Sequence, residues 1–529
     1  TGEHASFLRG LGSLYGSFFA AVSALTGKSR HLFFGGDALT PRLDRAITET
    51  LENLQAEPFI CWQNTWWSRG AFLELVEECE SRLAASQFKA GHRIALLLPN
   101  SPILLAVAVA IWRLGGAVVP VDYRGGYVTL IKQLKHADVF AAITFRGCSN
   151  IVPLISEEGI PCIITDLDAP GPIIAGRLSD EESTDTAVIF YTSGTTGEPK
   201  AVPLTHKNLM SIIDACVEHI DTLTDDDVFL NALPNFNSLG FVCGALIALV
   251  KGARQVVLQS FMPPEGALNT MRNASVTIVP AVPTMISLLM GAAARGVTPP
   301  HTLRYILSGG DRLPHDFDKR SRDILGAPVI EGYGLTEASS VVSLPPGTGR
   351  RKDGTVGTLL SSVEAQIRSD EGEVLPVGSE GQLWIRGDSV ASCYYRNPAL
   401  TEERFVEGWF NTCDIARFDS DGYLSLVGRT SDVMFVGGFK VYAQEIEKVL
   451  LEHPSVAEVA VIGVPRSITG EIVKAFVVLK AGEKVTSREL LDSCRKKLSY
   501  YKVPRILEFV DKMPRSSIGE ILKRKLEKD

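Results

Sequence analysis

Short apolar runs alternate with helical stretches along most of this chain from about residue 90, and this alternation restricts the fold more than any other feature. Residues 93–98 and 117–121 have the length and apolar character of strands, and residues 102–114 between them have those of a helix. The same rhythm returns over residues 228–294. Because strands that alternate with helices form parallel sheets covered by helices, we predict an α/β fold.

The character of the sequence changes after about residue 353. Short β-like runs at 364–368, 381–386 and 423–427 are separated by turn signals, which predicts a small β-rich subdomain. A compact α/β pattern then closes the chain and is long enough for an independent domain. A chain of 529 residues exceeds what one hydrophobic core organises. We therefore expect an amphipathic segment at 1–30, a large domain at 31–430 and a small domain at 431–529.

Charge and cysteine content exclude several classes of protein. The formal net charge is −8, whereas binding to a nucleic acid backbone needs a positive surface, so no nucleic acid partner is expected. The nine cysteines include no CxxC pair, which argues against a zinc site or a disulfide framework. No apolar run reaches the ~18 residues of a membrane span, and the first residues lack the features of a signal peptide. A cytoplasmic location is therefore expected.

The first segment has a continuous apolar face. Apolar residues between Phe7 and Leu25 recur every three or four positions, as they do on one side of a helix. A helix of this kind can lie peripherally on a membrane, dock on a partner, or pack against its own domain. Gly10, Gly12 and Gly16 weaken an isolated helix, so we expect the segment to need a surface on which to fold.

A loop rich in hydroxyl groups and glycines follows the β-like run at 186–190 and precedes a helical stretch at 208–217. Glycines let backbone amides converge on one point, hydroxyls donate further hydrogen bonds, and a lysine adds charge, so the loop suits a polyphosphate. It lacks the spacing of a Walker loop. Taken by itself, a loop of this composition is as typical of a flexible turn as of a phosphate-binding site. The residues expected to hold phosphate are Thr192, Ser193, Gly194, Thr195, Thr196, Gly197 and Lys200.

The run Ser-Gly-Thr-Thr-Gly-Glu-Pro-Lys in this loop resembles the signature of the adenylate-forming superfamily, which contains acyl-CoA synthetases, adenylation domains and luciferases. The resemblance continues in order over about residues 60–529 and is closest to fatty-acyl ligases. It implies two α/β subdomains and a β-rich subdomain in a large N-terminal domain, followed by a small mobile α+β domain. The other segments that carry it are Ser308-Gly309-Gly310-Asp311, Glu331-Gly332-Tyr333-Gly334-Leu335-Thr336-Glu337, Trp409-Phe-Asn-Thr-Cys413-Asp414 and Gly428-Arg429.

The resemblance assigns these residues to ATP and Mg²⁺. It implies that Tyr333 stacks on the adenine bordered by residues 308–311, with Gly332 and Gly334 leaving room beside it. Thr336 would contact the α-phosphate, and Glu337 would hold the metal, for which a carboxylate oxygen is a suitable ligand. Asp414 and Arg429 would bind the ribose, since an ionised carboxylate accepts two hydroxyl hydrogen bonds. Thr336, Glu337 and Lys200 are the catalytic candidates. His206 suits a capping or packing role as well as a catalytic one.

Members of this superfamily work in two half-reactions. A carboxylate first attacks the α-phosphate of ATP to give an acyl-adenylate and pyrophosphate, and a thiol then displaces AMP. The small domain rotates between the two steps. The resemblance places the hinge at Ser431 and Asp432, and it places the glycines that approach the pantetheine arm at Gly437 and Gly438.

One departure from the pattern concerns turnover. The family sequence Pro-x-x-x-x-Gly-Lys ends in a lysine that bridges the carboxylate and the α-phosphate, whereas this chain has Glu520 at that position. The replacement adds repulsion to an anionic transition state, so impaired adenylation is expected. Lys523, one helical turn from Gly519, is a candidate for compensation. If Lys523 does not compensate, the chain is a variant engineered to trap the adenylation state, an enzyme that mainly catalyses the thiol-transfer step, or a pseudoenzyme.

The expected acid pocket is largely apolar. We predict a medium or long fatty acid, with an aryl acid as the alternative, and either coenzyme A or the phosphopantetheine of an acyl carrier protein as acceptor. In the family pattern a histidine is common at the position of Asn237, and a glycine is common at the position of Cys413. The alternative to an enzyme is a binding or scaffolding protein, which would hold acyl-adenylate or acyl carrier protein without turnover. The predicted pocket residues are Phe236, Asn237, Leu239, Gly240, Val282 and Ser308.

Overall fold

A computed structural model describes the greater part of the chain, and none of its helices there is both long and apolar enough to cross a membrane. The segment 1–30 lies outside the described residues. These are residues 42–124, 126–172, 176–177, 183–192, 200–220, 222–311, 313, 316–347, 351–429, 433–436, 439–466, 470–498, 500–515 and 521–526.

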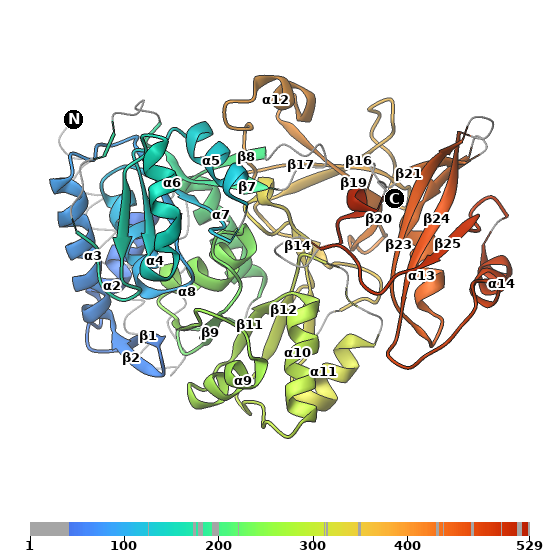
Figure 1. Cartoon of the computed structure of the whole chain (residues 1–529), viewed down its shortest axis with the longest axis horizontal. Helices are drawn as coiled ribbons and strands as arrows, with labels where there is room; N and C mark the ends of the chain where they lie inside the picture. The colour runs from blue at the N-terminus through green and yellow to red at the C-terminus, as the bar shows by residue number, and fades with distance from the viewer. Residues whose placement is uncertain are drawn as a thin grey trace, which may run out of the picture.

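A six-stranded sheet with the order β6-β5-β3-β4-β7-β8 forms the first half of the large domain, and Figure 1 labels its strands β7 and β8. Its strands are parallel except for β8, which returns antiparallel to β7. The loop predicted to hold phosphate connects these last two strands. The strands are β3 (Arg93–Leu97), β4 (Ala117–Pro120), β5 (Ala141–Phe145), β6 (Cys162–Thr165), β7 (Thr186–Thr192) and β8 (Lys200–Thr205).

A seven-stranded sheet with the order β13-β12-β11-β9-β10-β1-β2 forms the second half. All of its strands are parallel except the edge strand β2, which forms a hairpin with β1. The chain therefore enters this sheet, builds the other sheet, and returns. The strands are β1 (Pro58–Trp62), β2 (Thr65–Ser68), β9 (Val228–Asn231), β10 (Arg254–Val257), β11 (Ile278–Ala281), β12 (Tyr305–Ser308) and β13 (Val329–Glu331).

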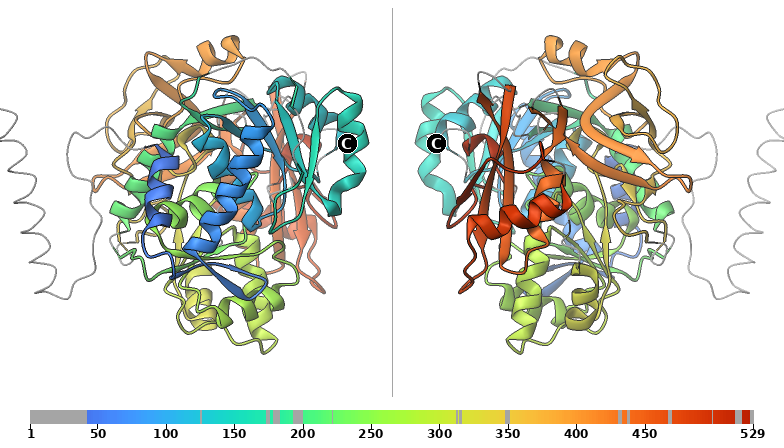
Figure 2. Two further views of the ribbon diagram at one scale, coloured as in Figure 1. Left: turned by 90° about the vertical axis from the view of Figure 1, so that its left-hand side faces the viewer. Right: turned by 90° about the vertical axis from the view of Figure 1, so that its right-hand side faces the viewer.

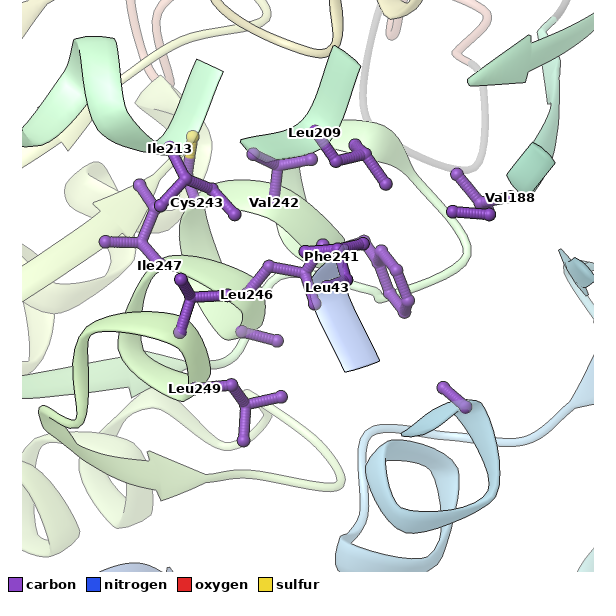
Figure 3. Packing of buried hydrophobic residues seen from close by; sticks show 14 of the residues in the cluster. Leu43, Val188, Leu209, Ile213, Phe241, Val242, Cys243, Leu246, Ile247 and Leu249 are labelled. Carbon is purple, nitrogen blue, oxygen red and sulfur yellow. The ribbon is translucent and has the colours of Figure 1, made fainter. Parts of the chain in front are cut away.

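The main hydrophobic core lies between the two sheets. One face of each sheet contributes to it, for example Phe190 of β7 and Phe229 of β9. A layer of helices fills the space between them, and Figure 3 shows Phe241, Leu246 and Leu209 of this layer packed together. The helices with buried residues in this core are α2 (Leu43–Glu52), α3 (Arg69–Ala85), α4 (Pro102–Arg113), α7 (His206–His219), the π-helical turn η2 (Gly240–Leu246) and α8 (Ile247–Lys251).

The outer face of each sheet carries its own helices. Alternate residues of one strand show the arrangement, since Ile94 of β3 faces the main core whereas Ala95 faces the outer one. The fold is thus helices, sheet, helices, sheet and helices in five layers. The outer helices are α5 (Tyr127–His136) and α6 (Val152–Glu157) on the first sheet, and α9 (Pro264–Asn273), α10 (Pro283–Ala294) and α11 (Phe317–Leu325) on the second.

Helix α4 illustrates how the sequence determines such an element. Ser101 caps its start by accepting a hydrogen bond from the Leu104 amide, and Pro102 supplies a favourable φ angle at the first turn. Every residue from Pro102 to Trp112 is buried, which explains why the helix is apolar on all sides. The chain then turns at Gly115, whose φ of +76° suits glycine.

The β-rich subdomain is an antiparallel sheet with the order β16-β17-β19-β18, in which β20 also pairs with β19. The short pair β14 (Ser343–Leu344) and β15 (Thr358–Leu359) precedes it, and the 3₁₀ turn η3 (Thr336–Ala338) lies before that pair. Its elements are β16 (Glu364–Arg368), β17 (Gly381–Arg386), α12 (Pro398–Arg404), β18 (Phe405–Val406), β19 (Trp409–Phe418) and β20 (Leu424–Arg429).

A separate sheet forms the C-terminal part, drawn in orange and red in Figure 2. Helices α13 and α14 pack on one face through a core of their own. The predicted α/β fold, with a large domain, a β-rich part and a small α+β domain, is confirmed. The elements of the C-terminal part are β21 (Val433–Val436), β22 (Phe439–Tyr442), α13 (Ala443–Leu451), β23 (Val456–Arg466), β24 (Gly470–Leu479), α14 (Ser487–Lys497), β25 (Ile506–Phe509) and the turn η5 (Lys523–Lys525).

Candidate active site

A cavity of about 1340 Å³ opens where the carboxyl ends of strands from both large sheets face the β-rich subdomain. Residues from segments far apart in the sequence meet there, and nearly all of the described candidate residues line it. Those that do are Thr192, Lys200, Phe236, Asn237, Leu239, Gly240, Val282, Ser308, Gly309, Gly310, Asp311, Gly332, Tyr333, Gly334, Thr336, Glu337, Asp414 and Arg429.

Glu331 is the exception among the described residues that were predicted to bind the nucleotide. It does not line the cavity, and its Oε1 accepts a hydrogen bond of 3.0 Å from the backbone amide of Leu313. Its carboxylate therefore holds the loop after β12 against β13. The prediction that Glu331 contacts the nucleotide gains no support from this geometry.

Asp414 forms one wall of the cavity together with Tyr333 and Arg429. Strands β19 and β20 place Asp414 directly opposite Arg429, and the Arg429 Nε donates a 3.1 Å hydrogen bond to Oδ1. The Tyr333 hydroxyl donates a 2.5 Å hydrogen bond to Oδ2. Burial raises the pKa of Asp414, and the Arg429 charge opposes that rise. Each carboxylate oxygen still has a lone pair for a ribose hydroxyl.

Cys413, beside Asp414, has a φ of +58°, in the region that favours glycine. Its amide donates a 2.8 Å hydrogen bond to Asn411 Oδ1, which fixes the bend. This backbone conformation suits the glycine that the family resemblance implies at this position. The cysteine side chain also lines the cavity.

Glu337 is oriented by Tyr394, a residue that the sequence did not single out. The Tyr394 hydroxyl donates a 2.7 Å hydrogen bond to Glu337 Oε1. The Lys200 Nζ lies 5.7 Å from the centroid of the same aromatic ring. Burial lowers the pKa of Lys200, the charge of Arg404 lowers it further, and Glu337 opposes both. In the sequence, the two adjacent tyrosines at 394 and 395 are the feature that could have drawn attention to Tyr394.

The part of the cavity that is predicted to bind the carboxylic acid has few polar groups. Thr336 Oγ1 lies 3.1 Å from Ser238 Oγ, and Asn237 Oδ1 accepts a hydrogen bond of 2.9 Å from the Leu239 amide. The Ser308 hydroxyl is buried and lines the cavity, and it has no hydrogen-bond partner within the described part of the chain. Since buried hydroxyls are seldom left unpaired, Ser308 is available to a bound molecule.

The glycines of the 331–337 segment are required by the protein itself. A Cβ atom on Gly334 would lie 1.7 Å from the backbone oxygen of Ser340, and one on Gly332 would lie 2.4 Å from Leu344 Cδ2. The space that a side chain would occupy at these glycines is filled by residues 340–344, and their place beside adenine stays a prediction. Their backbones still border the cavity.

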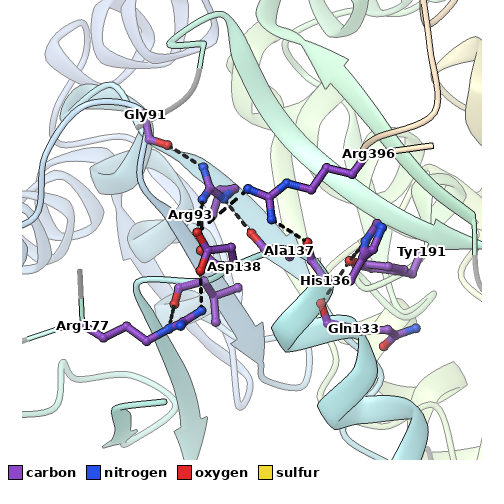
Figure 4. A network of polar contacts seen from close by, with 10 residues as sticks. Gly91, Arg93, Gln133, His136, Ala137, Asp138, Arg177, Tyr191 and Arg396 are labelled. Atoms are coloured by element: carbon purple, nitrogen blue, oxygen red, sulfur yellow. Dashed lines mark hydrogen bonds and ion pairs between the residues drawn. The ribbon is translucent and has the colours of Figure 1, made fainter. Parts of the chain in front are cut away.

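Tyr191 anchors the start of the predicted phosphate loop on helix α5 (Figure 4). Its hydroxyl donates a 3.0 Å hydrogen bond to the Gln133 backbone oxygen and lies 2.9 Å from His136 Nδ1. At the next turn of the chain, Asp138 pairs with the buried Arg93 at 3.2 Å. Residues 193–199 lie outside the described part, so the expected phosphate contacts there remain a prediction.

His206 lies away from the cavity and supports the fold. It is buried, its Nε2 lies 2.9 Å from Arg42 Nη2, and its ring meets Trp112 edge-on. Burial, with a smaller contribution from Arg42, lowers the pKa of His206 to about 3. The packing alternative therefore fits the structure.

Lys523, the candidate for compensation, is engaged within the C-terminal part. Its Nζ lies 2.8 Å from Glu447 Oε1, which also accepts the Val461 amide. Lys523 would have to leave this ion pair before it could reach the nucleotide. The other predicted site residues of this part, Glu520, Ser431, Asp432, Gly437 and Gly438, lie outside the described residues.

A magnesium ion fits the cavity with few protein ligands. The described residues contain no group of three or more His, Cys, Asp or Glu side chains that could hold a metal alone. Glu337 offers one carboxylate in the cavity, and Mg²⁺ commonly takes one or two carboxylates together with substrate phosphates and waters. Glu337 is the residue that would hold it.

The layered fold and this cavity define an adenylate-forming enzyme. The AMP-binding enzyme family matches residues 47–395, and the C-terminal domain of AMP-binding enzymes matches residues 445–520. The chain belongs to this family. Its members activate a carboxylic acid with ATP as acyl-AMP, and the acid–CoA ligases among them form a coenzyme A thioester.

Similar proteins include ligases for different acids. The chain is 35% identical to a long-chain-fatty-acid–CoA ligase of Yersinia pestis over 66% of its length and 62% of that protein. It is 33% identical to a feruloyl-CoA synthase of an Amycolatopsis species over 83% of its length and 89% of that protein. The structure of MenE, the O-succinylbenzoate coenzyme A synthetase of Bacillus subtilis, with ATP and magnesium aligns with a TM-score of 0.80 at 28% identity, covering 92% of this chain and 99% of MenE.

Proposed function

We propose that this protein activates a fatty acid with ATP and passes the acyl group to a phosphopantetheine thiol, with the first step slowed by Glu520. One observation carries the proposal. A single cavity joins the predicted nucleotide residues Tyr333, Thr336 and Asp414 to an apolar extension between the two large sheets. Both substrates of an adenylation can thus meet in one space.

The apolar extension favours an alkyl chain. It leads from the nucleotide residues toward helix α7 and strand β9, and burying each methylene there contributes about 0.8 kcal/mol. An aryl acid such as the substrate named for the feruloyl-CoA synthase is the second candidate, favoured by that similarity. The apolar residues of the extension are Cys216, Ile220, Leu223, Phe229, Leu233 and Ile247.

The reaction proposed is an acyl transfer in two steps. A carboxylate oxygen attacks the α-phosphorus of ATP, and the bond to the bridging oxygen of pyrophosphate breaks. The thiol sulfur then attacks the acyl carbon, and AMP leaves. We assign Tyr333 to the adenine, Asp414 and Arg429 to the ribose, and Thr336 and Lys200 to the phosphates. A bound Mg²⁺ would screen the charge of the phosphates.

Glu520 opposes the first step on electrostatic grounds. A unit charge about 4 Å from another contributes roughly 4 kcal/mol at an effective dielectric near 20, so replacing attraction by repulsion costs orders of magnitude in rate. The ion pair of Lys523 with Glu447 supports the view that Lys523 does not take over. The acceptor is coenzyme A or a carrier protein, reached after rotation about Ser431 and Asp432 and past Gly437 and Gly438.

Pyrophosphate release tests the proposal. ATP, Mg²⁺ and a panel of fatty and aryl acids are supplied to the parent chain and to Glu520→Lys, with Glu371→Lys on an exposed turn as the control for net charge. We expect weak release in the parent and in the control, strong release in Glu520→Lys, and a preference for fatty acids. Equal release in all three would show that Glu520 is tolerated. No release in any of them would favour a binding or scaffolding protein.

The second half-reaction is tested separately. Synthetic acyl-adenylate is supplied with coenzyme A or with holo acyl carrier protein, which bypasses the step that Glu520 affects. Thioester formation with one acceptor would identify it, and silence with both would contradict the transfer step. Liposome co-sedimentation of the chain with and without residues 1–27 tests the proposed peripheral contact, and equal behaviour would remove it.

A further inference from the structure

We propose that Arg404 is a second cation, beside Lys200, that binds the phosphates of the nucleotide in this cavity. The assignment rests on the proposed function in one respect, namely that the cavity takes ATP. Arg404 ends helix α12 and lines the cavity together with Lys200, Glu337 and Asp414.

The guanidinium of Arg404 is held in place without being neutralised. Its Nε and Nη2 both donate to the backbone oxygen of Asn411, at 3.0 and 2.6 Å, and its Cζ lies 5.5 Å from the Phe410 ring centroid. A carbonyl fixes orientation but carries no net charge. Throughout the described residues, no carboxylate lies within ion-pair distance of Arg404. Among the residues that the structure describes, Nη1 has no hydrogen-bond acceptor, so its hydrogens can donate to a ligand.

Arg404 lines the same cavity as Lys200, assigned to the phosphates, and Asp414, assigned to the ribose. Its charge lowers the pKa of Lys200 and opposes the rise in the pKa of Asp414, so it lies within electrostatic reach of both. Two cations that face one half-buried space repel each other, and a polyanion placed between them removes that repulsion. An anion-binding site therefore follows from the geometry.

The carboxylates that line the same part of the cavity do not cancel this charge. Glu337 accepts the hydroxyl of Tyr394 and is the proposed metal ligand. Glu403 lines the cavity and precedes Arg404, but the two form no ion pair. Asp414 is paired with Arg429. Within the described part of the chain, Lys200 and Arg404 line the cavity and form no ion pair, so both charges can meet phosphates.

An arginine suits this task better than a lysine. Its planar fork can meet two phosphate oxygens at once, and the contact with Asn411 sets the plane of the fork before the ligand arrives. The role also matters more in this chain, because Glu520 stands where the family places a lysine. The sequence gives no hint of it, since Arg404 follows two glutamates in an ordinary helix end.

Nucleotide binding to the full chain tests the proposal. ATP and adenosine affinities are measured by calorimetry with Mg²⁺ for the parent, Arg404→Ala, Arg404→Lys and the control Arg417→Ala. Arg417 lies on β19, pairs with Glu380 and does not line the cavity. We expect Arg404→Ala to weaken ATP binding at least about tenfold and to leave adenosine binding within about twofold, since a charge-assisted contact to phosphate is lost. Arg404→Lys should fall between.

The outcomes separate this proposal from the proposed function. Equal loss of ATP and adenosine binding in Arg404→Ala would show that Arg404 acts through Asp414 and the ribose, and would overturn the assignment. So would unchanged ATP binding. If the parent binds no ATP, both proposals fail. If it binds ATP in an Arg404-dependent way without releasing pyrophosphate, only the proposed turnover fails. Equal melting temperatures of Arg404→Lys and the parent show that the fold is retained.

Discussion

The hydroxyl of Tyr333 donates a 2.5 Å hydrogen bond to Oδ2 of Asp414, although 81 residues separate the two in the sequence. Arg429 holds the other oxygen of the same carboxylate. The residue assigned to the adenine and the residue assigned to the ribose are thus one connected unit, which is positioned before any nucleotide arrives. Such preorganisation lowers the cost of binding.

Asp414→Asn should weaken the recognition of ribose. The amide keeps the size of the side chain but loses the charge that pairs with Arg429 and one acceptor for hydroxyls. We expect the KM for ATP to rise about 10- to 100-fold, since a hydrogen bond to a charged group contributes about 1.5–3 kcal/mol. The parent should discriminate against 2′-deoxy-ATP, and the variant should lose most of that discrimination. An unchanged preference for ATP over 2′-deoxy-ATP would contradict the assignment of Asp414.

Tyr394→Phe should raise the requirement for Mg²⁺. The ring and its contacts with Phe405 and Phe410 remain, whereas the hydrogen bond that orients Glu337 is lost. Groups that orient a metal ligand typically matter by tenfold or more in affinity, so the Mg²⁺ concentration for half-maximal ATP binding should rise about tenfold. Tyr127→Phe, on the exposed start of α5, is the control. A magnesium titration that matches the parent would show that Tyr394 does not orient a metal ligand.

Substitutions of Cys413 should change stability in opposite directions. At a φ of +58°, a side chain costs about 1–2 kcal/mol that glycine avoids, while glycine loses about 0.5–1 kcal/mol through the unfolded state. We therefore expect Cys413→Gly to be more stable than the parent by up to about 1 kcal/mol. Cys413→Val should be less stable, because β-branched residues disfavour this region. Urea unfolding measures both, and equal midpoints would argue against backbone strain at this position.

His206 should make the protein less stable in mild acid. Its pKa is about 3 in the folded state against an ordinary 6.5, so below pH 6.5 the unfolded chain binds a proton that the folded chain does not. The stabilisation is complete above pH 6.5 and is lost progressively down to about pH 3. Between pH 7 and pH 5 the loss from this group is about 2 kcal/mol.

The variant His206→Gln removes that titration and keeps a polar side chain toward Arg42. Its free energy of unfolding should be lower than that of the parent at pH 7. It should also depend less on pH, because near pH 5 the variant takes up about one proton fewer than the parent on unfolding. Urea unfolding of parent and variant at pH 7, 6 and 5 measures the difference. Parallel pH profiles would mean that His206 is not buried in its neutral form.

Local sequence patterns predicted the elements of the fold well, but they did not predict some of the contacts between residues. Residues 102–114 were expected as a helix and form α4 within one residue, because its capping residue and apolar positions are local. Residues 240–246 form the π-helical turn η2, which the apolar pattern of this stretch does not predict. Asn235 and Gly240 are packed together there by the hydrogen bond from Asn235 Nδ2 to the Gly240 oxygen.

The sequence by itself determined the α/β class and most of the residues that line the nucleotide cavity, because short motifs carry their chemistry in residue type and spacing. Only the tertiary structure decided which neighbours those residues have. Tyr394 beside Glu337, Arg404 beside Lys200 and Arg42 against His206 come from segments far apart in the chain. Such contacts depend on how the sheets and the β-rich subdomain pack, and local propensity holds no record of that packing.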